Sequence, residues 1–287
     1  GMTEKVLLDT DIGTDIDDAV CLTYLLNQPQ CELLGITTVT GEPVKRAMLA
    51  SAICKHNGVE VPIYPGLDTP LLNEQWQKEV PQAEALSNWE HETDFPRGKA
   101  IEFLRETIHQ HPGEITLMTI GPLTNIGVLF RMDPEIPGLL KRVYSMCGYY
   151  QGKLEWNAMG DPYATAIVYQ NPASVHRSFG LDVTQKVYLD AEVVRERFQS
   201  RALEPVLDFA EVWFTKNRGL TFHDPLPAVA LFDSEVCSFQ RGNVEVELVS
   251  NRVKGMTHWE ADLRGPHEVA FAVDVERFFE DFYSVVK

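Results

Sequence analysis

The stretch VLLDTDIGTDIDDAVCLTYLL, from Val6 to Leu26, joins an apolar run, an acidic turn and an apolar segment with helical spacing. Val6–Leu8 is predicted to be a buried strand, and Ala19–Leu26 the helix that follows it. Carboxylates packed this densely repel one another, so the turn points to a bound cation. Five aspartates lie within the ten positions 9–18: Asp9, Asp11, Asp15, Asp17 and Asp18.

Strand-like and helix-like segments continue to alternate along the chain. The expected strands are Val6–Leu8, Glu32–Val39, Val61–Tyr64, Ile115–Thr119, Arg142–Met146 and Val244–Val249. The expected helices are Ala19–Leu26, Val44–His56, Ala100–Gln110, Leu123–Arg131, Pro162–Tyr169 and Val275–Val286. Such alternation is typical of a mostly parallel sheet with helices on its faces. We therefore predict a single α/β domain over residues 1–287, with a Rossmann-like central sheet flanked by helices.

Two segments stand apart from this series. Gly1, before Met2, is expected to be a remnant of an expression tag. Residues 71–98 are polar and contain Pro81 and Pro96. Because loops of this length in compact domains are usually lids or disordered segments, we expect an active-site lid or a mobile surface loop.

The composition restricts the classes of partner. With 42 acidic and 25 basic residues, the formal net charge is −17, which argues against nucleic acid or an anionic membrane as a partner. No apolar run approaches the ~20 residues of a transmembrane helix. Five scattered cysteines without a CxxC spacing indicate reduced thiols and a cytoplasmic location. These properties are compatible with a cation site and a neutral small-molecule substrate.

Helix capping explains only part of the acidic turn. Asp15 is expected to be the N-cap of the helix, with Asp17 and Asp18 in its first turn, where the helix dipole favours negative charge. Asp9 and Asp11 precede the turn, at a strand end where α/β proteins bind ligands. A Ca²⁺ ion accounts for the whole set, because it binds several carboxylate oxygens at once.

Two other acidic motifs match the turn less well. An EF-hand loop starting at Asp9 would need an acid in place of Gly13 and a glutamate in place of Val20, so it is excluded. DTDIGT also resembles the DxDGT turn of haloacid-dehalogenase-type phosphatases, with an inserted isoleucine. Those enzymes need a later acidic pair, but Gly160–Asp161 is followed by PYATA. The phosphatase interpretation stays open as the weaker alternative.

Later segments place polar groups beside other strand ends. MTIGPLTNIG (118–127) ends a strand in a Gly-Pro turn, where backbone carbonyls are free to point outward. SMCGYYQGKLEWNAMGDP (145–162) places Met146 at a strand end. Glu155 and Asn157 lie on either side of one tryptophan, so both side chains can face the same cleft.

The segment TFHDPLPAVAL (221–231) places His223 and Asp224 before a helix that starts with proline. Asp224 is expected at the N-cap and Pro225 at the first helical position, which proline prefers. Taken alone, a His-Asp-Pro sequence marks a helix start more often than a catalytic site.

Together, these motifs resemble those of the inosine–uridine-preferring nucleoside hydrolase family. DTDIGTDIDDA is similar to the bacterial variant of the family's DxDPGxDD signature, with two extra residues before the paired acids. GITTVTG, GPLTNI, LEWN, GLDVT and HDP occur in the family's order and roughly its spacing, and the similarity continues to VDVERFF (273–279). The resemblance implies a Ca²⁺-dependent enzyme of nucleoside salvage that hydrolyses the N-glycosidic bond of ribonucleosides to ribose and free base.

The resemblance also assigns roles to individual residues. The implied calcium ligands are Asp11, Asp18, Asp224 and the backbone carbonyl of Ile120. The implied substrate contacts are Asp17, Glu42, Met146, Glu155, Asn157 and His223. Asp11 would also act as general base. His223, with an ordinary pKa of ~6.5, would protonate or hydrogen-bond the leaving base.

The sequence departs from the family in the substrate pocket. Glu42 stands where many members carry an asparagine near the sugar, and the short 152–155 loop lacks the asparagine that relatives direct to the 5′-hydroxyl. The lid has LSNWEHE (86–92) in place of a His-Gly pair. Trp89 is a candidate for stacking on the base and His91 for a second acid, with a surface position as the alternative for both.

These departures leave a second hypothesis open. The chain could be a relative that binds nucleosides or sugars with little hydrolase activity. By analogy with the family, a homodimer or homotetramer is expected under either hypothesis.

Overall fold

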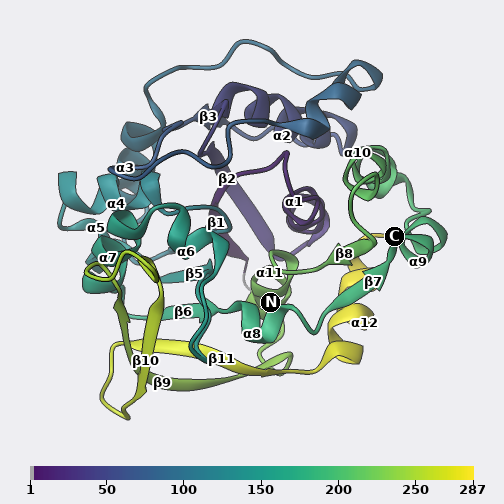
Figure 1. Cartoon of the computed structure of the whole chain (residues 1–287). Coiled ribbons are helices and arrows are strands. Elements are labelled where there is room, and N and C mark those ends of the chain that lie inside the picture. The colour runs from purple at the N-terminus through teal and green to yellow at the C-terminus, as the bar shows by residue number, and fades with distance from the viewer. Residues whose placement is uncertain (1–2) are drawn as a thin grey trace.

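The computed structural model describes residues 3–287, and β1 (Glu4–Thr10) lies inside a nine-stranded sheet (Figure 1). The strand order is β10-β9-β11-β6-β5-β4-β1-β2-β3. Neighbouring strands from β11 to β3 are parallel, whereas β9 is antiparallel to β11 and β10. The other strands of this sheet are β2 (Cys31–Thr38), β3 (Ile63–Pro65), β4 (Ile115–Thr119), β5 (Arg142–Met146), β6 (His176–Phe179), β9 (Cys237–Val246), β10 (Thr257–Ala261) and β11 (His267–Val273).

Helices cover both faces of the sheet, because its central strands are apolar on both sides. Val6 and Leu8 pack into the core on one face, and Leu7 packs into the core on the other. In Figure 1, α3, α4, α5 and α7 lie on the left of the sheet, with α1 and α12 on the right. The helices are α1 (Asp17–Asn27), α2 (Pro43–His56), α3 (Ala100–Gln110), α4 (Thr124–Met132), α5 (Ile136–Leu139), α6 (Trp156–Gly160), α7 (Pro162–Gln170), α8 (Leu181–Thr184), α9 (Ala191–Arg197), α10 (Glu204–Phe214), α11 (Pro225–Phe232) and α12 (Val275–Val285).

The strand order places a crevice between β1 and β4. In the order β3-β2-β1-β4-β5-β6, β2 and β3 are added on one side of β1, and β4 to β6 on the other side. The order of the strands therefore reverses between β1 and β4, as in doubly wound α/β folds. Ligands of such folds bind outside the carboxyl ends of the strands, next to the reversal. The segments that follow β1 and β4 are therefore the first part of the molecule in which to seek a site.

A small second sheet completes the region beside the crevice. It consists of β7 (Tyr188–Asp190) and β8 (Gly219–Thr221), which pair antiparallel. β8 leads into α11, and the turn between them faces the acidic turn after β1, since the backbone N–H of Asp224 donates to Asp17.

Residues 71–98, which we call the strap, cross the molecule outside α2. Their central part forms a 3₁₀ helix, η1 (Pro81–Asn88), that packs against α2 and α10. Gln82 fastens the strap to the acidic turn: its backbone N–H donates to the Gly13 carbonyl at 3.2 Å, and its Nε2 to the Thr14 carbonyl at 2.9 Å. Gly13 has φ +124°, and a Cβ at this position would overlap a Val80 methyl group. The strap and the turn are therefore closely packed.

The fold class that the sequence predicts is confirmed, and α3, β4 and β5 have the predicted bounds. The strand predicted at Val244–Val249 is wrong in its limits, since β9 begins at Cys237 and ends at Val246. Asp15 is not the N-cap of α1. Ile16 occupies that position, and the Asp15 side chain accepts a hydrogen bond from the Asp17 N–H instead.

Several elements have no counterpart in the sequence-based prediction, among them β6, β10, β11 and α8 to α10. Within residues 3–287, no helix combines the length and the apolar character that crossing a membrane requires.

Candidate active site

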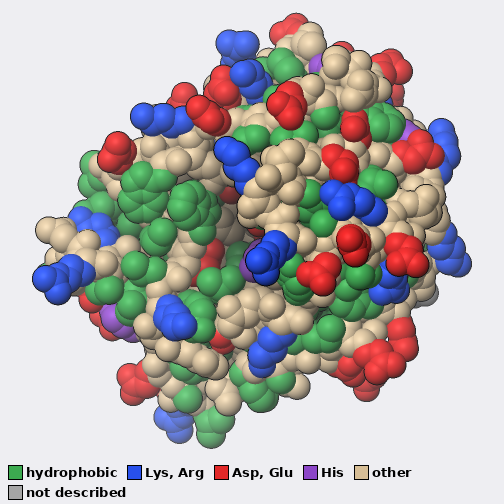
Figure 2. Space-filling view, turned by 45° about the vertical axis from the view of Figure 1, so that its right-hand side comes forward, with side chains coloured by type: hydrophobic (Ala, Val, Ile, Leu, Met, Phe, Trp, Pro, Cys, Tyr) green, Lys and Arg blue, Asp and Glu red, His purple; other side chains and the backbone are tan. Residues whose placement is uncertain are grey.

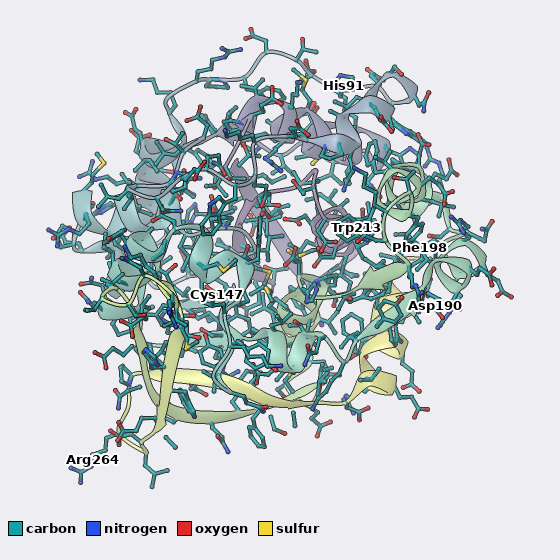
Figure 3. All side chains as sticks on the ribbon, in the orientation of Figure 1. His91, Cys147, Asp190, Phe198, Trp213 and Arg264 are labelled. Atoms are coloured by element: carbon teal, nitrogen blue, oxygen red, sulfur yellow. The ribbon has the colours of Figure 1, made fainter. Side chains whose placement is uncertain are left out.

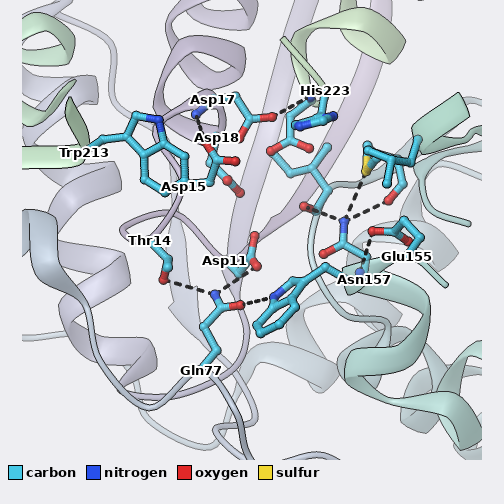
Figure 4. Close-up of a pocket in the computed structure, with 15 residues that line it drawn as sticks. Asp11, Thr14, Asp15, Asp17, Asp18, Gln77, Glu155, Asn157, Trp213 and His223 are labelled. Atoms are coloured by element: carbon cyan, nitrogen blue, oxygen red, sulfur yellow. Dashed lines mark hydrogen bonds between the residues drawn. The ribbon is translucent and has the colours of Figure 1, made fainter. Parts of the chain in front are cut away.

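A cavity of about 270 Å³ opens at the carboxyl ends of β1, β4 and β5. The surface is hollowed near the centre of Figure 2, with acidic atoms showing inside, and Figure 4 shows the lining side chains. Its size is close to the lower end for small-ligand sites, ~300 Å³. The lining residues are Asp11, Thr14, Asp15, Asp17, Asp18, Gln77, Ile120, Met146, Glu155, Trp156, Asn157, Leu181, Trp213, His223 and Asp224.

Three buried carboxylates converge on one side of the cavity. Asp17 and Asp18 come from the first turn of α1, and Asp224 from the turn before α11. Each offers one oxygen, and these oxygens lie within 4.8 Å of one another. The Thr10 hydroxyl donates to Asp18 at 2.7 Å, and the Asp224 N–H donates to Asp17 at 2.9 Å. Asp224 lies some 200 residues after Asp17 and Asp18 in the sequence, and the fold brings it beside them.

The carboxylate set fits a hard divalent cation. Burial and the charges of neighbouring acids raise the pKa values of Asp17, Asp18 and Asp224 well above the usual range. Two oxygens that bind the same Ca²⁺ at about 2.3–2.6 Å can lie up to about 5.2 Å apart, so the observed spacing suits shared coordination. The donors are all oxygens, which calcium prefers. The structure thus has an acidic site able to hold a metal ion.

Asp11 and Ile120 line the same cavity. Asp11 does not belong to the set of three, and its Oδ2 accepts a hydrogen bond from Gln77 Nε2 at 3.0 Å. The Ile120 carbonyl accepts from Asn157 Nδ2 at 3.2 Å, while its N–H donates to the Asp9 carbonyl at the end of β1. The four calcium ligands expected from the family resemblance therefore all border one cavity.

Glu155 is held by backbone N–H groups on the opposite wall. As the N-cap of α6, it accepts from Gly148, Asn157 and Ala158 at 2.6–3.0 Å. Burial outweighs these bonds and raises its pKa to about 7. The Asn157 amide donates to the Met146 carbonyl at 2.9 Å, so these three residues form one linked wall. Glu155 and Asn157 both line this cavity.

His223 lies beside the carboxylates, with its Nδ1 2.7 Å from the Thr184 hydroxyl. Burial lowers the pKa of His223 to about 4, so the expected ordinary value is wrong and the imidazole is neutral at pH 7. When the Thr184 hydroxyl donates to Nδ1, the ring proton is on Nε2. Thr184 belongs to the GLDVT motif, which thereby acquires an orienting role.

The structure does not bring three of the predicted residues into this cavity. Glu42 has a left-handed backbone (φ 56°), and its carboxylate pairs with Lys45 at 3.2 Å. Trp89 Nε1 donates to Asp208 at 2.8 Å, and His91 Nδ1 lies 2.7 Å from the Trp89 carbonyl. Figure 3 places His91 at the upper edge of the molecule, whereas Trp213 lies near its centre. Base stacking by Trp89 and acid catalysis by His91 therefore have no support in this geometry.

Five lining residues escaped the sequence-based prediction. Trp156 had a visible signal, because it lies between two predicted site residues. The segment 71–98, predicted as a lid or surface loop, contains Gln77, but nothing in the sequence distinguishes this residue within it. Trp213 had no signal, because α10 reaches the cavity only through tertiary packing. The five are Thr14, Gln77, Trp156, Leu181 and Trp213.

The chain is similar along nearly its whole length to proteins of known activity. The chain is 29% identical over 308 residues to the inosine-uridine preferring nucleoside hydrolase of Crithidia fasciculata, covering 97% of this chain and 96% of that protein. It is 26% identical over 326 residues to uridine nucleosidase 1 of Arabidopsis thaliana, covering 98% and 92% of the two chains. The purine-preferring ribonucleoside hydrolase of Gardnerella vaginalis has the same fold, with a TM-score of 0.84, 24% identity, and coverage of 99% and 98%.

A family model described as inosine-uridine preferring nucleoside hydrolase matches residues 6–280, nearly the whole chain. This confirms the resemblance carried by the acidic turn and the later motifs. The chain belongs to the inosine-uridine preferring nucleoside hydrolase family.

Proposed function

We propose that this protein is a Ca²⁺-dependent enzyme that hydrolyses the N-glycosidic bond of ribonucleosides to ribose and free base. The observation that carries the proposal is the convergence of Asp17, Asp18 and Asp224 on one cavity that Asp11 and Glu155 also line. In a chain of this family, such a cavity supplies the oxygen ligands of a cation and the acceptors for a sugar.

Asp11, Asp18, Asp224 and the Ile120 carbonyl would hold the ion. Bound there, Ca²⁺ supplies positive charge that lowers the pKa of a coordinated water. The ribose would be oriented by Asp17, as an acceptor for a hydroxyl, and by the wall of Met146, Glu155 and Asn157 opposite. The cavity, of about 270 Å³, would receive the sugar between these two walls.

Asp11 is the general base of this proposal. Its carboxylate lies at the cavity wall, where it can accept the proton of the attacking water. Cleavage of the bond develops positive charge on the ribosyl ring, as in other glycosyl transfers. The surrounding carboxylates stabilise that charge electrostatically.

His223 assists the departure of the base from the other side. With the Thr184 hydroxyl donating to Nδ1, the neutral imidazole carries its proton on Nε2 and donates a hydrogen bond to the leaving base from that atom. This hydrogen bond stabilises the negative charge that develops on the base, which then takes its proton from water. Thr184 fixes the ring in the orientation that this step needs.

The proposal extends to location and assembly. All five cysteines are free and four are buried, which supports a reducing, cytoplasmic environment. A homodimer or homotetramer is proposed on the analogy with the family alone.

The two alternatives have weaker support. The phosphatase interpretation needs an acidic pair after Gly160, but PYATA supplies no second acid after Asp161. The Asp161 carboxylate itself caps α7 and accepts from Thr124 and Leu71. A nucleoside-binding relative without hydrolase activity would need the same cavity, so only turnover distinguishes it.

Incubation with inosine, guanosine, uridine and cytidine in CaCl₂, followed by detection of reducing sugar, tests the proposal. We expect release of ribose from at least one nucleoside, and loss of about 10²–10⁴-fold in kcat for Asp11→Asn, because the variant lacks the base. Asp262→Asn, on an exposed turn, is the control and should match the wild type. Tight nucleoside binding with no ribose release would support the binding relative instead.

A further inference from the structure

The side chain of Gln77 reaches from the strap into the cavity and contacts the proposed general base. It is 7% exposed. Its Nε2 donates to Asp11 Oδ2 at 3.0 Å and to the Thr14 hydroxyl at 3.2 Å, while its Oε1 accepts from Trp156 Nε1 at 2.6 Å (Figure 4). Both the nitrogen and the oxygen of the Gln77 amide therefore have hydrogen-bond partners in the cavity wall.

The indole of Trp156 fixes the orientation of the amide. An indole N–H can only donate, so the atom of Gln77 that faces it must be the carbonyl oxygen. The NH₂ group then faces Asp11, whose ionised carboxylate can only accept. A flipped amide would place two donors together at Trp156 and two acceptors together at Asp11. The network therefore permits one arrangement.

Arg46 fixes the backbone of Gln77 relative to the acidic turn. Its fully buried guanidinium donates to the Gln77 carbonyl at 3.3 Å and the Glu79 carbonyl at 3.2 Å, on the strap. The same group donates to the Asp11 carbonyl at 2.7 Å. One rigid cation thus sets the distance between the strap and Asp11.

A glycine allows this close approach. A Cβ on Gly41 would lie 2.6 Å from Lys78 Cα, so the strap backbone rests directly on the turn after β2. Glu42, next in the chain, turns outward to Lys45 and does not reach the cavity. Among residues 3–287, Gln77 is the residue whose side-chain amide donates to Asp11.

We propose that Gln77 is a positioning residue for Asp11, an inference that rests on the proposed function and adds the strap to it. The amide holds Oδ2, so that Oδ1 would be the oxygen available to a cation or to the attacking water. Residues that orient a metal ligand typically change metal affinity or activity by about 10–100-fold when they are removed. The strap is then part of the reaction centre, through one side chain.

The test compares Gln77→Leu with the wild type by calorimetric titration of calcium into chelator-treated protein, and by kcat and KM for the best nucleoside. We expect the calcium Kd to rise and kcat to fall by about 10-fold or more, with KM within about threefold, because Asp11 is misoriented while the sugar wall is intact. Gln77→Glu keeps the shape but cannot donate, so at saturating calcium its kcat should fall at least as far.

Gln82→Leu is the matched control. Gln82 also ties the strap to the acidic turn, through the Thr14 carbonyl, but it does not line the cavity. Its kcat and calcium Kd should stay within about twofold of the wild type, while urea unfolding shows a loss of about 1 kcal/mol, the size of one hydrogen bond.

Equal effects of Gln77→Leu and Gln82→Leu on kcat and calcium Kd would overturn the inference, since strap docking alone would then explain both. A Gln77→Leu protein with wild-type kcat and Kd would overturn it too. Failure of the proposed function has a different signature, in which the wild type itself releases no ribose from any nucleoside.

Discussion

Asp17, Asp18 and Asp224 are buried together although burial, and after it the charges of nearby acids, raise the pKa values of all three. Helix capping does not explain this arrangement, since the Asp224 side chain makes no capping bond to α11 and Ile16 is the N-cap of α1. Buried like charges are retained in proteins where a counter-charge or a function compensates them. A shared cation is the compensation that suits an all-oxygen donor set.

At the residue scale, the role of His223 can be separated from that of the carboxylates. His223→Ala should lower kcat about 10²–10³-fold on inosine or uridine, whose bases are poor leaving groups. On an aryl riboside with an acidic phenol as leaving group, the variant should stay within about threefold of the wild type, because the phenolate leaves without a hydrogen bond to stabilise it. Equal losses on both substrates would contradict the leaving-group role. Steady-state kinetics of both proteins on the two substrates measures these changes in kcat.

The residue scale also shows what the sequence could predict. Asp11, Asp17, Asp18, Glu155, Asn157, His223 and Asp224 all line the cavity, because each follows a strand end or starts a helix in a recognisable motif. Gln77 and Trp213 could not be found in this way. Their places depend on the path of the strap over Arg46 and on the packing of α10, which are long-range contacts without a local signal.

At the element scale, the packing of the strap on the acidic turn depends on Gly13. Gly13→Ala should destabilise the protein by about 2–4 kcal/mol, because the added methyl overlaps Val80 and the positive φ is strained. Gly58→Ala is the control, with φ +67° and open space around the position, and should cost only about 1–2 kcal/mol of strain. Urea unfolding of both variants checks the difference. Equal losses of stability in the two variants would mean that the strap moves to accommodate the added methyl group, which would contradict the prediction.

The strands β4 and β5 were easier to predict than β9. β4 and β5 are short and almost entirely buried, and each stands out between polar or turn-forming residues. β9 has the sequence CSFQRGNVEV, whose polar residues face solvent along much of the strand, and only its end looks strand-like. α6 and α8 have five and four residues, too few for a helical period to be visible.

At the scale of the whole molecule, His176 links stability to pH. It is fully buried in β6, and its ring stacks on Tyr169 and meets His267 edge-on. Neither ring nitrogen has a hydrogen-bond partner within residues 3–287. Burial, with a smaller effect of His267, lowers the pKa of His176 to about 3. The unfolded chain has the ordinary value of ~6.5 and binds the proton first. This contribution to stability is therefore complete above pH ~6.5 and is lost as the pH falls toward 3.

His176→Phe should remove this dependence. Between pH 8 and pH 5 the wild type should lose about 2 kcal/mol more stability than the variant, from the difference between the two pKa values. The acidic site titrates equally in both proteins, so its contribution cancels in the comparison. Denaturant unfolding at the two pH values measures the difference, and parallel losses in both proteins would contradict the prediction.

The central claim is that distant segments of this chain surround one calcium ion on which nucleoside hydrolysis depends. Its most direct test is a calcium titration of chelator-treated protein, with bound calcium and ribose release from uridine or inosine followed together. We predict that activity is nearly absent without calcium and returns in proportion to the binding of about one ion per chain, as expected for a single coordination site. Full hydrolysis in excess chelator, with no calcium bound, would contradict the account.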